Sequence, residues 1–152
     1  MSALNPIFTI GDQTVETINA RAQLGRVARA LAIDWLARTG LPEPARALSQ
    51  YPRELSGGLT QRAMIAQALA PTPAVLIADE PTSALDETVQ RQILNLLASL
   101  QTELGLTTVL FTHDLSVVAE YAQRVAIMYA GRLVESANSV QLFASPQHPY
   151  TR

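Results

Sequence analysis

The sequence contains no lysine and no cysteine. All 11 basic side chains are arginines, scattered along a chain whose formal net charge is −2. Without a basic tract, nucleic acid is not an expected partner. Without cysteine the chain has neither a disulfide framework nor a thiolate metal site, which fits a reducing compartment. The missing lysine also excludes the phosphate-binding motif GxxxxGK[ST], whose lysine contacts the β- and γ-phosphates of a nucleotide.

Long hydrophobic runs are also missing. No apolar stretch approaches the roughly 18 residues that indicate a membrane-spanning helix. The N-terminus has no basic-then-apolar pattern typical of a signal peptide. The length of 152 residues fits one domain.

A Ser-Gly-Gly turn stands in front of a helical pattern at Leu55–Leu59. Ser56 is a favourable N-cap, and Gly57 and Gly58 allow a ligand to approach the backbone closely. The free N–H groups of a helix start favour an anion, above all phosphate. The alternative is a capped helix that binds nothing.

An apolar run, Val75–Asp79, ends in a carboxylate. Because the run does not alternate, it predicts a strand buried on both faces, as in a parallel sheet. Asp79 and Glu80 then emerge at the carboxyl end of that strand, where open α/β sheets bind ligands. One carboxylate can hold Mg²⁺, and the next can act as a general base, worth roughly 10²–10⁴ in rate. The alternative is an acidic pair that caps the helix after Pro81.

Together these pieces resemble, in order and spacing, the signature motif, Walker B strand and D-loop of ABC-type ATPases. The resemblance implies that Ser56, Gly57 and Gly58 contact the γ-phosphate of ATP held by the opposite subunit. It implies that Asp79 lies on the Mg²⁺ side, acting through water, and that Glu80 is the catalytic base. It assigns a D-loop at the dimer interface to Ser83, Ala84, Leu85 and Asp86. Leu59 departs from the general pattern, which has glutamine there.

The remaining periodicities predict helices and strands along the rest of the chain. One long amphipathic helix is expected over 14–38, stopped by Gly40 and Pro42, with Trp35 in the core. Further helices are expected over 43–50, 58–70, 87–104, 115–122 and 139–144, and strands over 107–112, 124–129 and 132–136. Ala130-Gly131 indicates a hairpin between the last two strands.

His113 follows the strand predicted over 107–112 and precedes a helix capped by Asp114. A lone histidine is usually structural. The ABC ATPases place a switch histidine here, which contacts the γ-phosphate, so the resemblance implies a catalytic role for His113. For Arg62, a solvated surface charge and a role near the phosphate remain equal alternatives.

Residues at both ends of the chain indicate one branch of this family. The stretch SALNP near the start and the tail SPQHPYTR resemble the oligopeptide, dipeptide and nickel branch of the ABC ATPases. That branch often carries an apolar residue at the position of Leu59. The alternative for residues 1–13 is an ordinary polar leader. The Walker A motif and the Q-loop of the family are absent from this sequence.

The implied fold class is α/β: a partial P-loop NTPase domain of the ABC ATPase type. Residues 1–72 would form the segment after the Q-loop, a helical subdomain and the signature helix. Residues 73–136 would form the Walker B, D-loop and H-loop part, with parallel core strands and a hairpin, and residues 137–152 a tail. Such a chain is expected to expose an open sheet edge and apolar surface, which invites aggregation.

The implied function is that of an ATP-binding subunit, present as a fragment, of an importer of peptides or nickel. Its cofactors would be ATP and Mg²⁺. Its partners would be a second ABC ATPase subunit and transmembrane permease subunits at the cytoplasmic face of the membrane. The chain alone is expected to be inactive, because it has no P-loop lysine. Two alternatives stay open: a non-catalytic partner that donates its signature motif in trans, and a decayed remnant. A chromosome-maintenance ATPase is disfavoured by the absence of sustained heptads and by the HPYT tail.

Overall fold

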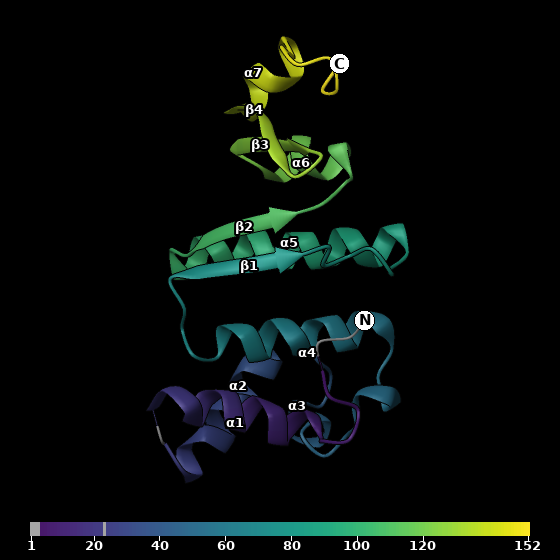
Figure 1. The fold of residues 1–152 in the computed structure, drawn as a ribbon. Helices are drawn as coiled ribbons and strands as arrows, with labels where there is room; N and C mark the ends of the chain where they lie inside the picture. The colour runs from purple at the N-terminus through teal and green to yellow at the C-terminus, as the bar shows by residue number, and fades with distance from the viewer. Residues whose placement is uncertain (1–3, 23) are drawn as a thin grey trace. The chain divides into compact units, whose positions relative to one another are not determined.

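The computed structural model describes residues 4–22 and 24–152, which form two compact units (Figure 1). The boundary falls after Val109, within a strand, and each unit is considered by itself. The α/β class predicted from the sequence is confirmed. The predicted segments 1–72, 73–136 and 137–152 follow the motifs rather than these units and stay predictions. Residues 1–3 and Gln23, which fall inside the first segment, lie outside the described residues.

The first unit is mostly helical and ends in a small parallel sheet (Figure 1). No helix in the described part of the chain is long and apolar enough to cross a membrane. The elements, in chain order, are α1 (Ile10–Ala22), α2 (Arg26–Arg38), α3 (Pro44–Ala47), the 3₁₀ turn η1 (Pro52–Glu54), α4 (Gly57–Leu69), β1 (Val75–Asp79), α5 (Glu87–Leu104) and β2 (Thr107–Phe111).

The single long helix predicted over 14–38 is wrong. The structure has two helices, α1 and α2, separated around Gly25, whose φ of 53° and ψ of −121° leave the helical region. The break lets α1 and α2 fold back onto each other and onto α4. The apolar residues continue at helical spacing across the break, and this is why periodicity alone joined the two helices.

The polar-leader alternative for residues 1–13 is also wrong for the residues described. Helix α1 begins four residues before the predicted start, where Thr9 and Asp12 cap each other: the Thr9 N–H donates to Asp12 Oδ2 at 3.3 Å, and the Asp12 N–H donates to Thr9 Oγ1 at 3.1 Å. This pair is a capping box. Gln13 is 7% exposed, and its amide donates to the carbonyl oxygens of Asn5 and Phe8.

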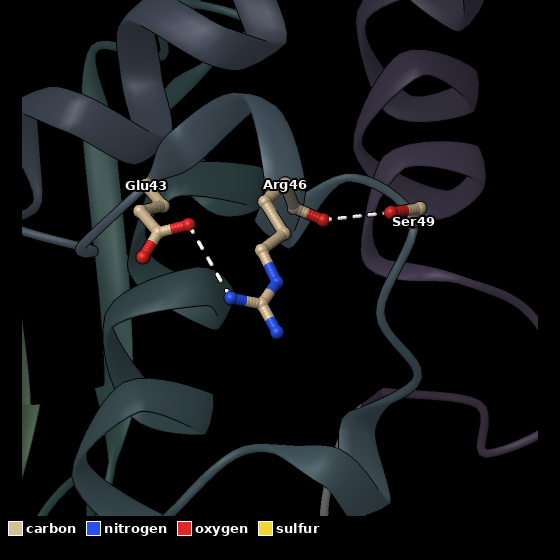
Figure 2. Close-up of polar contacts among 3 residues, drawn as sticks. All are labelled: Glu43, Arg46 and Ser49. Atoms are coloured by element: carbon tan, nitrogen blue, oxygen red, sulfur yellow. Dashed lines mark hydrogen bonds and ion pairs between the residues drawn. The ribbon is translucent and has the colours of Figure 1, made fainter.

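The short helix predicted over 43–50 is limited to α3, and its ends are held by local polar contacts (Figure 2). Glu43 has a left-handed φ of 46° at the N-cap. Its carboxylate accepts from the Arg46 guanidinium at 3.4 Å, and the Ser49 hydroxyl donates to the Arg46 carbonyl at 2.8 Å (Figure 2). An exposed pair of this kind contributes about 0–1 kcal/mol, so these contacts shape the turn rather than stabilise the unit.

The core of the first unit lies between α4 and its neighbours α1, α2 and α5. Leu36, Leu69 and Ile93 are fully buried there, and Trp35 is 4% exposed, which confirms its predicted place in the core. The apolar stripe predicted on α5 is confirmed as well, with Leu97 and Leu100 buried on that face. Gly105 ends α5 in the left-handed conformation, at φ 63°.

Strand β1 is buried on one face only, so the expectation of burial on both faces is wrong. Leu76 and Ala78 are buried, whereas Val75 is 52% and Ile77 67% exposed. β1 pairs with β2 through the α5 crossover in a two-stranded sheet (Figure 1), the connection that parallel strands need. The expected exposed apolar surface is thus confirmed, on the face of the sheet that carries Val75 and Ile77.

The second unit, residues 110–152, is built on an antiparallel hairpin. Ala130 (φ 48°) and Gly131 (φ 74°) form its two-residue turn, and positive φ at both positions is the signature of a type I′ hairpin turn. The predicted hairpin is confirmed, although its second strand runs on to Asn138. The elements of this unit are α6 (Leu115–Tyr121), β3 (Arg124–Tyr129), β4 (Arg132–Asn138) and α7 (Ser139–Ala144).

The C-terminal tail returns to the hairpin and is held by one carboxylate. Glu135 accepts hydrogen bonds from the backbone N–H groups of Gln147, at 2.8 Å, and His148, at 3.0 Å. The rings of Tyr129 and Tyr150 also touch, with centroids 4.7 Å apart. The pKa of the Glu135 carboxyl is held below its usual range by the Thr151 hydroxyl first, and then by these two N–H groups. The Thr151 hydroxyl makes no hydrogen bond of good geometry, so it acts on the carboxylate as a nearby dipole.

We expect acid to release this tail. A carboxyl whose pKa is lowered by folding contributes stability above its unfolded value, near 4.5 here, and loses it as the pH falls through the folded pKa. Hydrogen exchange at the Gln147 and His148 amides should therefore accelerate, relative to the hairpin amides, as the pH is lowered from 7 to below 4.5. Glu135→Gln should show the fast exchange at pH 7 already.

The same variant provides the control. His148 Nδ1 accepts from the Tyr150 N–H at 3.1 Å, a contact within the tail that does not involve Glu135 and should persist in Glu135→Gln. A tail that stays equally protected in the variant and the parent at pH 7 would contradict the role given to Glu135.

Candidate signature and Walker B site

The Ser-Gly-Gly turn opens α4 as the sequence predicted. Ser56 is the N-cap, with extended backbone, and its hydroxyl oxygen accepts from the Leu59 N–H at 3.4 Å. Ser56 and Gly57 are exposed, so the start of α4 is open to solvent. A helix start of this kind carries partial positive charge and directs N–H groups outward, which suits a phosphate.

The two glycines lie against the segment after β1. A Cβ built on Gly57 would lie 3.3 Å from Leu85 Cδ2, and one built on Gly58 only 2.7 Å from Val89 Cγ1. Leu85 belongs to the predicted D-loop, and Val89 lies in the first turn of α5. The structure therefore brings two of the predicted motifs, the signature turn and the D-loop, into contact within one unit.

Asp79 and Glu80 lie at the carboxyl end of β1, and both are exposed. Glu80 has a φ of 44°, a conformation that is uncommon for residues other than glycine and recurs at functional sites. Its carbonyl accepts from the Ser83 N–H at 3.3 Å and from the Ser83 hydroxyl at 3.2 Å. The strained residue thus begins a turn that is closed by the D-loop serine.

The alternative role for the acidic pair, capping the next helix, is wrong. Helix α5 begins at Glu87, and its N-cap is Asp86, whose Oδ1 accepts from the Val89 N–H at 3.0 Å. Asp79 and Glu80 precede this cap by several residues. The acids at the strand end are therefore not explained by helix capping.

The exposed carboxylates at the strand end suit a Mg²⁺ site whose oxygen ligands come partly from the protein and partly from a nucleotide and water. No group of three or more His, Cys, Asp or Glu side chains gathers as a metal site among residues 4–22 and 24–152. Mg²⁺ usually keeps several waters and takes one or two carboxylates together with substrate phosphates. One exposed carboxylate, that of Asp79, fits such a site, in which a nucleotide supplies the other oxygens.

His113 lies in the second unit, two residues after the end of β2. It is exposed, and the residue after it, Asp114, caps α6 by accepting from the Ser116 N–H at 2.9 Å. That cap was predicted from the sequence and is confirmed. The structure thus puts His113 in the loop between a strand and a helix.

Sequence reasoning missed the residues that support the turn. Neither Leu85 nor Val89 was expected beneath the glycines, because the pairing joins segments about 30 residues apart and has no local signal. The structure also shows what the Arg62 side chain contacts. Its guanidinium donates to the Thr39 carbonyl at 2.7 Å and to Gln92 Oε1 at 3.4 Å, so it links α2, α4 and α5 and is not a solvated surface charge.

Known proteins agree with these features. Residues 2–83 match the ABC transporter family. The chain is 53% identical over 152 residues to a putative peptide import ATP-binding protein of Brucella melitensis, covering 99% of this chain and 45% of that protein. It is 50% identical to the glutathione import ATP-binding protein GsiA of Escherichia coli K12, covering all of this chain and 25% of that protein. The chain thus spans about half the length, or less, of these curated relatives.

Solved structures give the same result. A dimeric ATP-binding cassette in a post-hydrolysis state, bound to ADP and Pi, matches with a TM-score of 0.77 at 32% identity, over 90% of this chain and 59% of that one. A second dimeric structure, of a bacterial ABC transporter cassette, matches with a TM-score of 0.76 at 33% identity. The family match covers more than half of the chain and coincides with the turn and the strand described above. The chain therefore belongs to the ABC transporter family.

Proposed function

We propose that this chain is the portion of a peptide importer's ATP-binding subunit that carries the signature motif, the Walker B strand and the D-loop. The observation that supports this most is the packing of the Ser56–Gly58 turn on Leu85, beside a strand that ends in Asp79 and Glu80. A phosphate-binding helix start and a pair of carboxylates at a strand end are the parts that nucleotide hydrolysis requires.

In this proposal the turn works on ATP held by a second subunit. The Ser56 hydroxyl and the backbone N–H groups of Gly57 and Gly58 bind the γ-phosphate at the start of α4. Residues Ser83, Ala84, Leu85 and Asp86 face the second subunit as the D-loop. Both solved structures, which are of the same cassette, are dimeric, and this supports a paired arrangement.

The acids supply the chemistry. Asp79 would hold Mg²⁺ through water, and the bound metal would supply positive charge beside the phosphates. Glu80 accepts a proton from the attacking water as general base, for which its exposed carboxylate at the strand end is suited. His113 donates a hydrogen bond to the γ-phosphate. The water oxygen bonds to the γ-phosphorus as the bond to the β–γ bridging oxygen breaks, and ADP and phosphate leave.

The proposed substrate, partners and location are drawn by analogy with the relatives. The printed names of the Brucella and Escherichia proteins describe import of peptide and of glutathione, which is itself a short peptide. We therefore favour a peptide over nickel as the transported substrate. Permease subunits in the membrane and a second ATP-binding subunit would hold the chain at the cytoplasmic face.

A second function has one observation in its favour. The chain has no lysine, so it cannot form the phosphate-binding loop that a complete subunit provides. It would then act as a non-catalytic partner, which lends its signature turn in trans to a complete subunit.

Both proposed functions require the chain to associate with a complete ATP-binding subunit, and mixing it with a full-length relative tests this. The chain should associate with the full-length Brucella peptide import protein in the presence of ATP and Mg²⁺, but not of ADP, as measured by light scattering after size exclusion. Gly57→Asp should weaken this association about tenfold or more, because a carboxylate beside the γ-phosphate replaces attraction by repulsion.

The control carries the same charge elsewhere. Ala45→Asp adds a carboxylate to the exposed first turn of α3, a position with no predicted phosphate contact, and should leave the association unchanged. An acid in the first turn of a helix is favourable, but a side chain at position 57 also meets Leu85 at 3.3 Å, so the Tm of each variant is measured beside its association. Association that is independent of the nucleotide, or unaffected by Gly57→Asp, would contradict the proposed role of the turn.

A further inference from the structure

The signature turn lies directly on two side chains of the next motif. Leu85 Cδ2 lies 3.3 Å from the Cβ position of Gly57, and Val89 Cγ1 lies 2.7 Å from that of Gly58. A distance below 3.0 Å leaves no room for a methyl group, so a side chain at position 58 would displace one of the two elements. Gly57 has more room, because the atom it meets is the end of a flexible leucine.

Space, rather than backbone conformation, requires these glycines. The glycines with a left-handed φ in the described chain are Gly25, Gly40, Gly105 and Gly131. Gly57 and Gly58 instead occupy the first two positions of α4, where an alanine could adopt the same φ and ψ. Helix propensity alone would make alanine the better residue there. Propensity and packing therefore predict effects of opposite sign for the same substitution.

Val89 is held rigidly in its place. Its N–H donates to Asp86 Oδ1 at 3.0 Å, which fixes it in the first turn of α5. A β-branched side chain in a helix has essentially one preferred rotamer. The Val89 side chain therefore has little freedom to rotate away from Gly58. The hydrogen bond to Asp86 fixes the position of Val89 along α5 relative to the turn.

We propose that Leu85 and Val89 are positioning residues for the signature turn, so that the D-loop and the phosphate-binding end of α4 move as one body within the chain. The proposal rests on the proposed function of the turn. Its consequence is specific: contact of a second subunit with residues 83–86 would shift Ser56–Gly58 directly, without passing through the sheet. Contact with the second subunit and binding of phosphate would then both act on the same packed unit, residues 83–86 together with Ser56–Gly58.

Substitutions at positions 58 and 89 of the full chain test the packing. Gly58→Ala should lower Tm by about 3–10 °C, since overpacking outweighs the gain in helix propensity. Adding Val89→Ala removes the obstructing methyl groups and should restore part of that loss, so that the double variant is more stable than Gly58→Ala. This rescue remains measurable if the single variant is poorly folded.

Leu96 provides the matched control. It lies on the same helix, is partly buried against the same core, and stands about 10 Å further along the axis. Leu96→Ala combined with Gly58→Ala should be additive, because distant sites do not couple. A rise in Tm on Gly58→Ala, or a Val89→Ala double variant that is merely additive, would overturn the proposal.

A second readout separates positioning from general stability. In Val89→Ala, amide exchange should accelerate at Leu59 and Thr60, whose N–H groups bond to Ser56, and at Leu85, but not along the rest of α4. Val89→Ile, which keeps both γ-carbons, should restore the parent pattern. Uniform acceleration through α4 and α5 would overturn the proposal. If the coupling is found but ATP-dependent association with the complete relative is absent, the proposed function fails and the packing stands.

Discussion

The purified chain should release no phosphate from ATP and Mg²⁺ above the uncatalysed rate. The reason is compositional: with no lysine in the sequence, the chain lacks the cation that clamps the β- and γ-phosphates in these enzymes. Glu80 and the Ser56–Gly58 turn then have no nucleotide held in position to act on. Phosphate release, measured with a coupled assay at saturating ATP, checks this expectation.

Glu80→Gln distinguishes a true absence from a contaminant. Replacing a general base costs roughly 10²–10⁴ in rate where that base operates. Because we expect no turnover by the chain alone, the substitution should change nothing in the isolated protein. Mg²⁺-dependent turnover that Glu80→Gln abolishes would show that this chain catalyses hydrolysis by itself and would refute the expectation. An ATPase of known activity serves as the positive control for the assay.

Trp35→Ala should destabilise the first unit by about 3–5 kcal/mol. The indole is 4% exposed in the core, and the Arg38 guanidinium lies over it, 4.3 Å from the ring centroid. Its removal leaves a cavity that the packed helices cannot fill. Since small domains have about 5–15 kcal/mol of stability in total, urea titration followed by far-UV circular dichroism should show a much lower midpoint.

Two variants separate the indole's volume from its cation contact. Trp35→Phe keeps most of the apolar volume and should cost clearly less. Arg38→Ala removes both the cation over the ring and the 2.6 Å ion pair with Glu103. Because that pair is partly exposed, its loss should cost about 1 kcal/mol or less. A midpoint for Trp35→Ala close to that of the parent would show that the helices of the first unit do not depend on this core.

The features that the sequence predicted well are those set by neighbouring residues. The Ser56 and Asp114 caps, the Gly105 helix end and the Ala130-Gly131 turn each depend on side chains within a few positions. The Thr9–Asp12 capping box was equally local and could have been found, because it has the expected spacing of a Thr followed three residues later by an acid.

The features it missed depend on contacts between distant segments. The break between α1 and α2 required knowing that the two helices pack on each other, and the place of Arg62 depended on the Thr39 carbonyl, 23 residues away. The half-buried state of β1 depended on what covers the sheet. The candidate site was predicted residue by residue through family resemblance, yet the contact between Gly58 and Val89 has no signature in either segment alone.

The uncovered side of β1 has a consequence for the life of this chain in a cell. Val75 and Ile77 stand on it beside the 41% exposed Val109, and together they form a strip of β-branched side chains that chaperones and proteases recognise in newly made proteins. Transient exposure of such strips directs chains to triage, where small differences in folded population change abundance several-fold. The steady-state amount of this protein should therefore be set by whatever reaches that strip first, a binding partner or the degradation machinery.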